Sequence, residues 1–536
     1  MPPTTPSHHR SPAVILAVVA FGVFIAADDL TVVSTMLRQI IFDLEIPLPD
    51  ELNRAAWIVN AYLIAYVVVM PFVGRLSDLV GRRAVYVGSL VLFLVGSIWL
   101  PLAGSLNSFI AGRVLTALGG GAMVPVAMAV IGDVYAPARR ARALGTLGAV
   151  DTAGWVWGPL YGAFLIRYFS WQWQFYLNVP LSLAAMALAW WALADLPKPD
   201  QRARIDWAGT AVLTICLIAL NVALLGSGDV QAAGGFAALN EPAPINTTFF
   251  YALAAVTFAL FVWIEWRLGR KALSVTREPS TDHGLPITDN GSRITHHASP
   301  LIDLSLFRRP NFSPAVLINF LVGFILIIAM VNVPLLVNVL EFEPQQAAVV
   351  SGLLLSGMTL AMAIMSYVGG RLTERWGYRP VTAVGLLLCA VGMVLMGWTW
   401  SVETPYGQMA WQLVILGLGF GLVMAPVGTA VINAAPASER GVAASLVIVL
   451  RLIGMSVGLA GLTAWGLHRF QLLRRMIELP NLPLSDPVYQ QALTDGLMRV
   501  TVAVLAETFL VSAGVAVLAL VVAWWLRGSV GDEVMG

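Results

Sequence analysis

Long apolar segments follow one another along almost the whole chain, with short polar segments between them. Fourteen of them approach the roughly 20 mostly apolar residues that a membrane-spanning helix needs, and many contain the Gly and Pro that lipid-embedded helices tolerate. The pattern therefore predicts an all-α membrane protein. The predicted spans lie at about 14–36, 55–74, 84–103, 108–131, 144–168, 175–194, 207–227, 248–268, 314–340, 347–370, 381–400, 411–432, 441–470 and 500–526.

Composition agrees with a membrane protein. Of 536 residues, 58% are hydrophobic and only 11% are charged, whereas about a quarter of the residues in a soluble domain are charged. The formal net charge of +1 provides no basic surface for nucleic acid. Cys216 and Cys389 both lie in apolar segments without metal-ligand spacing, so we interpret them as packing residues. The polar start and the absence of a small-residue cleavage site predict a retained first helix.

Arginine is distributed unevenly between the two sides of the predicted membrane. On one side, predicted to be the outer side, the segments 104–107, 341–346 and 401–410 contain no Lys or Arg. Since cytoplasmic loops carry the positive excess, both termini are predicted to be cytoplasmic. The loops predicted on the cytoplasmic side hold Arg75, Arg82, Arg83, Arg139, Arg140, Arg142, Lys198, Arg202 and Arg204, and the outer side holds the exceptions Arg38, Arg54, Arg469, Arg474, Arg475 and Arg499.

An internal repeat divides the chain. Residues 74–83 recur as residues 370–379, and each copy joins the second and third helix of a six-helix set. Such duplication predicts two bundles, at 1–196 and 313–536, with a two-helix insert at 197–270 between them. The segment 271–312 is rich in Pro, Ser, Thr, Gly and His and is predicted to be a cytoplasmic linker.

The first copy of the repeat resembles the loop signature of the major facilitator superfamily. Gly74 would let two helices approach closely, and Asp78 could accept backbone N–H groups at a helix start while pairing with an arginine. The resemblance implies a gate at the cytoplasmic ends of the bundles, and a plain positive loop is the alternative. The residues assigned to this gate are Gly74, Arg75, Asp78, Gly81, Arg82, Arg83, Gly370, Glu374 and Arg375.

A second motif lies in the fifth predicted helix. Gly154, Gly158, Pro159 and Gly162 resemble the G-x-x-x-G-P-x-x-G antiporter motif of proton-coupled exporters. The glycines permit close backbone contact and the proline bends the helix. A bare packing motif would have the same appearance, so the motif favours export without establishing it.

Charged residues inside the predicted spans need a partner or a function, because each costs at least about 2.5 kcal/mol. Successive helical residues point about 100° apart, so Asp28 and Asp29 are not expected to face one cavity squarely. We hypothesise that Asp29 carries the transported proton and that Arg451 is its partner, with Asp151 second. A static ion pair is the alternative. The six residues are Asp28, Asp29, Arg113, Asp151, Arg451 and Glu507.

With these residues placed, the chain is similar to the fourteen-helix drug/proton antiporter family. Within it, the chain resembles the branch of mycobacterial triacylglyceride transporters that work with a lipid-carrying lipoprotein. The likeness is clearest at residues 29–33, 57–59, 70–75, 158–162, 451–455 and 464–470. It implies functional roles for Asp29 and Arg451, and it places a fifth-helix acid at Thr152, next to Asp151. Arg113 lies in a segment that resembles the family's buried-arginine motif.

The resemblance also implies a monomer in the bacterial inner membrane. A proton gradient would supply the energy without a bound cofactor, and a periplasmic lipid-binding lipoprotein is a candidate partner. The sequence contains no Ser/His/Asp set, metal-type cluster or phosphate loop, so an enzyme is not expected.

The last two predicted helices extend beyond the bilayer. The thirteenth continues through Leu472, Leu473, Met476 and Ile477 to near Pro480. Residues 485–487 predict a new helix start, and a helix from there to Arg527 would be about 60 Å long. Its Leu497, Val500 and Val504 could shelter acyl chains, or the ends could form an ordinary hairpin.

These features together predict proton-coupled export of a lipid or lipid-like amphiphile such as triacylglycerol. The alternative within transport is multidrug efflux of small hydrophobic compounds. A non-transporting membrane scaffold is a remote third possibility.

Overall fold

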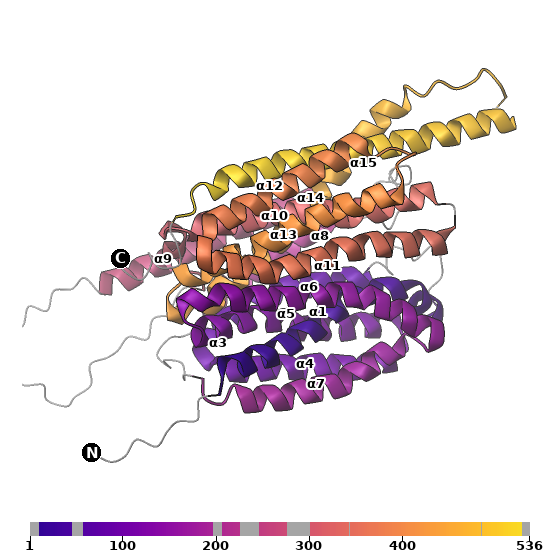
Figure 1. Cartoon of the computed structure of the whole chain (residues 1–536). Coiled ribbons are helices and arrows are strands. Elements are labelled where there is room, and N and C mark those ends of the chain that lie inside the picture. The colour runs from indigo at the N-terminus through magenta and orange to yellow at the C-terminus, as the bar shows by residue number, and fades with distance from the viewer. Residues whose placement is uncertain are drawn as a thin grey trace, which may run out of the picture.

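The computed structural model describes residues 10–45, 57–196, 206–225, 246–275, 301–341, 343–483 and 485–527. Within these residues all regular structure is helical, and the long helices run along a common direction (Figure 1). We call the end of the molecule that carries Arg10 and Arg527 the terminal face, and the opposite end the distal face. The long helices are α1 (Pro12–Asp43), α3 (Trp57–Val80), α4 (Arg82–Trp99), α5 (Leu106–Val134), α6 (Pro137–Tyr168), α7 (Gln172–Ala192), α8 (Trp207–Leu225), α9 (Thr247–Val275), α10 (Phe312–Leu340), α11 (Pro344–Trp376), α12 (Tyr378–Thr399), α13 (Tyr406–Ala434), α14 (Arg440–Arg474) and α15 (Pro487–Ala523).

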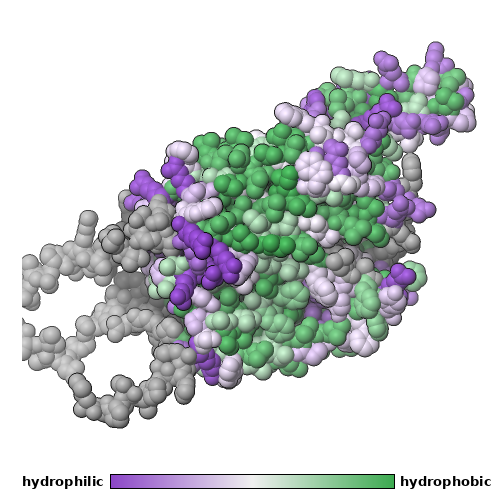
Figure 2. All heavy atoms as spheres, viewed as in Figure 1, coloured by the Kyte–Doolittle hydropathy of each residue, from purple (hydrophilic) through white to green (hydrophobic). Residues whose placement is uncertain are grey.

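Thirteen of these helices are long and apolar enough to cross a membrane. The exception among the described helices is α6, whose position matches the predicted span at 144–168. This helix packs against α1 and α11 and carries several charged residues, including Arg139, Arg142 and Asp151. The surface agrees with insertion in a membrane, since Figure 2 shows a hydrophobic band between two hydrophilic ends. A fourteenth span therefore stays a prediction.

Most helices are longer than the apolar segments that predict them. The prediction measures only the part that lipid can surround, whereas the backbone continues helically into the polar region at each end. The signature at residues 74–83, predicted as a loop, is an example. Here α3 ends at Val80 and α4 begins at Arg82, so the connection is Gly81 alone, with a φ of 109°. Its counterpart Gly377 has a φ of 80°, and both positions favour glycine because other residues are strained there.

The helices form two packed groups. In the N-terminal group, α1 and α3–α7 pack on one another, and in the C-terminal group α10–α15 do so. The groups meet mainly where α3 contacts α14 and where α6 contacts α11. The two remaining helices, α8 and α9, pack together, and α8 lies against both α3 and α14. The insert therefore covers one of the two main interfaces. The boundary predicted at residue 197 falls in an undescribed segment and stays a prediction.

The linker predicted at 271–312 is only partly described, because residues 276–300 lie outside the described residues. The part from residue 301 onward is packed, which corrects the expectation of a solvated linker there. Leu301, Ile302 and Leu306 are buried, and a short 3-10 helix spans Leu304–Arg308. The carboxylate of Glu265 in α9 accepts the backbone N–H groups of Leu301 and Ile302 at 3.3 and 3.4 Å. This end of the linker is thereby held against the insert.

The helix extensions at the distal face are partly as predicted. Helix α15 starts at Pro487 with Asp486 as its N-cap, and its 37 residues correspond to about 55 Å. Helix α14 ends at Arg474, so Met476 and Ile477 lie in the turn that follows and not in the helix. Figure 1 shows this pair of helix ends projecting beyond the rest of the distal face.

The apolar residues predicted to shelter acyl chains instead pack within the protein. Val504 is fully buried, and Leu497 and Val500 pack against the main hydrophobic core. Exposed apolar side chains at the tip include Met476, which is 73% exposed, and Val488, which is 59% exposed, together with Leu479 and Leu482.

Close packing between α10 and α14 generates a prediction. A Cβ atom on Gly454 would collide with the carbonyl oxygen of Phe320, whereas nothing lies within 4 Å of a Cβ atom on Gly461 in the same helix. We expect Gly454→Leu to lower the free energy of unfolding by about 1–3 kcal/mol or more through overpacking. Gly461→Leu should change it by less than about 0.5 kcal/mol. Thermal unfolding of the purified variants measures both, and equal stability of the two would contradict this packing.

Candidate functional site

A buried ion pair lies inside the N-terminal group. Asp29 of α1 is completely buried, and Arg113 of α5 is 1% exposed. A guanidinium nitrogen of Arg113 donates to the Asp29 carboxylate at 2.8 Å, and the same side chain reaches the backbone carbonyl of Asp29 at 3.4 and 3.5 Å. A buried charge is stabilised only when it is paired and hydrogen-bonded. Asp29 and Arg113 satisfy this requirement for each other.

Helix α7 supplies polar contacts to both acids of α1. Gln174 donates to the carboxylate of Asp28 at 2.9 Å, and Asn178 donates to that of Asp29 at 3.3 Å. Asp28 and Asp29 therefore both bond side chains of α7, although they are neighbours in a helix. The sequence analysis missed Gln174 and Asn178. Two amides four residues apart in an otherwise apolar helix were the signal, since residues at that spacing share one helix face.

The three glycines of the antiporter motif lie on α6, against the part of α1 that carries Asp28 and Asp29. A Cβ atom on Gly154 would lie 2.7 Å from Ala27 and 2.9 Å from the carbonyl of Phe24. A Cβ atom on Gly158 would lie 2.9 Å from the carbonyl of Asp28 and would collide with Thr31, and one on Gly162 would collide with Thr35. Pro159 lies in the same helix. The motif thus brings the backbone of α1 next to α6 at the position of its acidic residues.

A second acid–arginine pair joins the two groups. Arg451 of α14 lies 4.0 Å from the carboxylate of Asp151 in α6, and both side chains are largely buried. This corrects the hypothesis that Arg451 is the partner of Asp29, because Arg113 occupies that place. Thr152, where the resemblance placed an acid, donates its hydroxyl to the carbonyl of Gly148 at 2.8 Å. Asp151 is therefore the acidic residue of α6 that faces Arg451.

Two stacked tyrosines of α3 adjoin the first pair. The guanidinium of Arg113 lies 3.9 Å above the ring of Tyr62, and the rings of Tyr62 and Tyr66 stack with their centroids 5.8 Å apart. The tyrosines therefore extend the environment of the Asp29–Arg113 pair along α3. We call the two acid–arginine pairs, these two tyrosines and the two amides of α7 the central set. Sequence reasoning did not identify either tyrosine.

Glu507 does not belong to this central set. It forms a bidentate ion pair with Arg469 of α14, in which two guanidinium nitrogens donate to the two carboxylate oxygens at 2.6 Å each. Both side chains are about one-third exposed. Of the partner or function that the sequence requires for Glu507, the structure provides a partner, Arg469. The helical register of α15 directs this side chain toward α14, near the distal face, where the positive charge of Arg469 compensates it.

The first repeat copy joins the two groups at the terminal face. A Cβ atom on Gly74 of α3 would collide with the carbonyl of Gly441 in α14, and the reverse also holds. The carboxylate of Asp78 accepts the backbone N–H groups of Gly441 at 3.0 Å and Val442 at 3.2 Å, at the first turn of α14. Asp78 also pairs with Arg82 at 2.5 Å. The two roles predicted for Gly74 and Asp78 are thus present in the structure.

An ion network extends this contact. Asp133 at the end of α5 pairs with Arg82 at 3.0 Å and with Arg440 of α14 at 2.9 Å. The negative charge of Asp133 therefore bridges arginines from both groups. Arg75 is buried beside this network, whereas Arg83 stacks over Trp190 of α7 at 3.9 Å.

The second repeat copy makes the corresponding contact with different chemistry. A Cβ atom on Gly370 of α11 would lie 2.5 Å from the carbonyl of Ala141 in α6. Arg140 donates to Asn433 at 2.7 Å, and Asn433 donates to the hydroxyl of Tyr378 at 2.7 Å. Asn433 and Tyr378 thus stand where the first copy has Asp133 and Arg82. Arg375 is exposed, and a buried carboxylate oxygen of Glu374 accepts no hydrogen bond.

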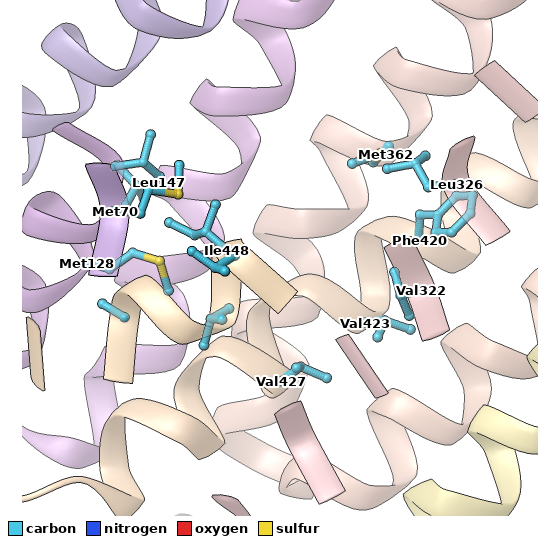
Figure 3. Packing of buried hydrophobic residues seen from close by; sticks show 14 of the residues in the cluster. Met70, Met128, Leu147, Val322, Leu326, Met362, Phe420, Val423, Val427 and Ile448 are labelled. Atoms are coloured by element: carbon cyan, nitrogen blue, oxygen red, sulfur yellow. The ribbon is translucent and has the colours of Figure 1, made fainter. Parts of the chain in front are cut away.

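Contacts between the groups reach from the terminal face to the middle of the bundle. Figure 3 shows Ile448 of α14 pointing toward Met70, Met128 and Leu147 of the N-terminal group. Arg451, one helical turn further, is at the level of Asp151. Nearer the distal face, a separate apolar cluster contains residues of the N-terminal group alone, among them Met36 and Trp171. The two groups are therefore joined along their terminal halves.

The Asp29–Arg113 pair generates a stability prediction. Arg113→Gln leaves a buried carboxylate without its positive partner, so we expect a loss of about 3–5 kcal/mol in the free energy of unfolding. The double variant Asp29→Asn with Arg113→Gln should lose less than Arg113→Gln alone, because no unpaired charge remains. Chemical or thermal unfolding measures both, with the exposed Arg142→Gln as control. A double variant less stable than the single one would contradict this pairing.

The two repeat copies generate a second prediction, since Asp78 accepts two backbone N–H groups and its counterpart Glu374 has a carboxylate oxygen without a partner. Asp78→Asn should weaken the contact between the groups by at least about 1 kcal/mol, as loss of a helix cap does. The ratio of molecules whose two groups are separated at the terminal face to molecules whose groups are joined there would then rise roughly fivefold. Spin labels attached at position 139 of α6 and position 371 of α11 report this separation as a longer distance between the two labels. Glu374→Gln is the matched control, and an equal shift in both variants would refute the unequal roles.

Comparisons with known proteins agree with this architecture. A family model described as Major Facilitator Superfamily matches residues 19–459. A triacylglyceride transporter of Mycolicibacterium hassiacum is 31% identical over 549 residues, covering 98% of this chain and 95% of that protein. A probable triacylglyceride transporter of Mycobacterium leprae is 32% identical over 470 residues, with coverage of 84% and 83%.

Two solved structures share the fold at low sequence identity. A major facilitator superfamily proton:xylose symporter matches with a TM-score of 0.60 at 14% identity, covering 96% of this chain and 95% of that one. The human organic anion transporter MFSD10 matches with a TM-score of 0.57 at 14% identity, covering 96% and 100%. With the fold, the repeated signature and these relatives in agreement, the chain belongs to the major facilitator superfamily and is a membrane transporter, not an enzyme.

Proposed function

We propose that this transporter exports a lipid or lipid-like amphiphile in exchange for protons, by alternating access. The observation that carries the coupling proposal is the presence of two buried acid–arginine pairs, one inside a group and one between the groups. One pair, Asp29–Arg113, is internal to the N-terminal group. The other, Asp151–Arg451, lies between the groups and must separate if they move apart at mid-membrane. Protonation of a carboxylate releases its arginine, so proton binding and group movement can be linked.

In this proposal the terminal face is cytoplasmic, and the protein lies in a bacterial inner membrane. The terminal face carries Arg82, Arg140, Arg308 and Arg379 among its many arginines, in line with the positive-inside rule. The contacts at Gly74–Gly441 and Gly370–Ala141 then close the cytoplasmic side. The structure would correspond to an outward-facing state, in which substrate leaves toward the periplasm.

A lipid substrate is supported by the relatives' names and by the surfaces available for a lipid path. The insert occupies the α3–α14 interface, which leaves the α6–α11 interface as the one facing the membrane directly. Large apolar side chains are exposed on both of these helices, including Trp157 and Phe164 of α6 and Leu353 of α11. A molecule with acyl chains could pass between them without leaving an apolar surface. The projecting ends of α14 and α15 would offer a periplasmic lipoprotein a place to dock.

Multidrug efflux is the second candidate function. The same buried acids and the same apolar surfaces would serve a small hydrophobic cation, and the antiporter motif occurs in exporters of both kinds. The projecting helix ends favour the lipid, because a small drug needs no support beyond the bilayer. A monomer, working with a lipid-binding lipoprotein, fits this proposal.

We expect proton-dependent lipid movement in proteoliposomes that contain the purified protein. A fluorescent triacylglycerol analogue should move when a proton gradient is imposed, and Asp29→Asn should reduce this movement at least tenfold by removing the titrating group. The exposed loop acid Glu403 provides the matched control, and Glu403→Gln should retain full activity. Ethidium, tested in parallel, reports drug transport.

Each result decides one part of the proposal. Ethidium movement without lipid movement would indicate that the protein is a multidrug transporter. Full gradient-dependent activity in Asp29→Asn would refute the assignment of Asp29 as the proton carrier. Lipid movement at the same rate with and without a proton gradient would refute proton coupling.

A further inference from the structure

A cavity of about 730 Å³ opens at the terminal face of the C-terminal group, away from the interface between the groups. It lies where α10 and α12 begin and α15 ends, and its volume is in the usual range for small-molecule sites. Asn311 joins the start of α10 to the end of α15, because its side chain donates to the carbonyl of Arg527 at 3.0 Å and accepts the backbone N–H of the same residue at 2.6 Å. The cavity is therefore a built feature of the fold.

The lining of this cavity is strongly positive. Arg308, Arg379 and Arg527 all contribute to it, and no Asp or Glu is among the described residues that line it. The beginnings of two helices against the end of one add a net positive contribution from the helix dipoles. Three guanidinium groups around one concave site match the geometry and charge of a phosphate group, whose oxygens accept paired N–H bonds.

The aromatic lining places the cavity at a membrane boundary. Trp524 is 71% exposed and Trp525 is 61% exposed, and the guanidinium of Arg379 lies 3.7 Å above the ring of Trp524. Tryptophan is enriched where the hydrocarbon layer meets the headgroups. Exposed apolar side chains continue from the cavity toward the membrane on each helix, at Leu317 of α10, Leu387 of α12 and Val521 of α15. A ligand with a phosphate headgroup and acyl chains would find partners for both parts.

The internal repeat supplies a comparison within the same molecule. At the terminal face of the N-terminal group, Arg83 lies 3.9 Å above Trp190, as Arg379 does above Trp524. The neighbouring Arg10 lies 4.6 Å above Trp191, but it also pairs with Asp195 at 3.5 Å. An acid thus pairs with one of the two arginines there, whereas the described residues that line the C-terminal cavity include no acid. The described parts of the two sites therefore differ in charge.

We propose that this cavity binds the phosphate headgroup of one anionic phospholipid from the adjacent leaflet. Arg308, Arg379 and Arg527 bind the phosphate, Trp524 and Trp525 lie at the glycerol level, and the acyl chains follow the exposed apolar faces of α12 and α15. The site lies apart from Asp29, Asp151 and the proposed α6–α11 lipid path. It is therefore a resident-lipid site and not part of the transport route.

Native mass spectrometry of the full-length protein, titrated with phosphatidylglycerol in detergent, tests the proposal. The wild type should retain one phosphatidylglycerol in preference to phosphatidylcholine. Arg308→Gln, Arg379→Gln and Arg527→Gln together should weaken retention roughly 100-fold, because each arginine near a phosphate surface contributes about fivefold. The control variant removes three exposed arginines of the same face outside the cavity, as Arg139→Gln, Arg142→Gln and Arg371→Gln. It should retain the lipid as the wild type does.

The outcomes distinguish a site for a lipid from a site for a free anion. They also distinguish loss of the binding site from a failure of the variant to fold. Inorganic phosphate at millimolar concentration should not displace the lipid, and displacement by phosphate alone would overturn the proposal in favour of a soluble-anion site. Equal retention by the cavity and control variants would also overturn it. If the triple variant does not fold, Arg308→Gln and Arg379→Gln tested singly should each weaken retention severalfold. Because binding is measured without transport, the result is independent of the proposed export function.

Discussion

The carboxylate of Asp29 is a negative charge in the interior of a membrane protein, and the arrangement of the N-terminal group follows from the need to compensate it. Arg113 of α5 supplies the opposite charge, Asn178 of α7 supplies a hydrogen bond, and Tyr62 covers the guanidinium. These partners come from three helices, so α3, α5 and α7 must keep their register with α1 for the charge to stay stabilised. The same requirement places Asp151 and Arg451 face to face between the groups.

Close backbone contacts provide the geometry in which these pairs can form. At Gly154 and Gly158 the helices α1 and α6 approach so closely that a methyl group would not fit, and the contact lies next to Asp28. At Gly74 and Gly441 the two groups make a similar contact at the terminal face. Without a hydrophobic driving force between lipid-embedded helices, such contacts and buried polar bonds hold the bundle together. The signature motifs are therefore packing sites that also position charges.

The two repeat copies use the same backbone contact with unequal chemistry. The first surrounds it with Asp78, Arg82, Asp133 and Arg440, whereas in the second the neutral Asn433 and Tyr378 stand in the places of Asp133 and Arg82. The first copy is therefore an ion network, and the second is a run of hydrogen bonds from Arg140 through Asn433 to Tyr378. A further difference lies at the terminal face, where three arginines line the cavity beside Trp524 and Asp195 pairs with Arg10 at the N-terminal counterpart.

The sequence by itself determined the number and places of the apolar segments, the repeat, and which residues carry charge into the membrane. Hydrophobicity is a local property, and the motifs that resemble the family's signatures also lie within single segments, so the close contacts of Gly74, Asp78 and the motif glycines could be predicted from them. Only the tertiary structure decided the partners. Asp29 pairs with Arg113 and not Arg451, Glu507 pairs with Arg469 away from the centre, and Gln174, Tyr62 and Tyr66 join the central set. The physical reason is that an ion pair depends on the rotation and crossing of helices distant in the chain, and no single segment contains that information.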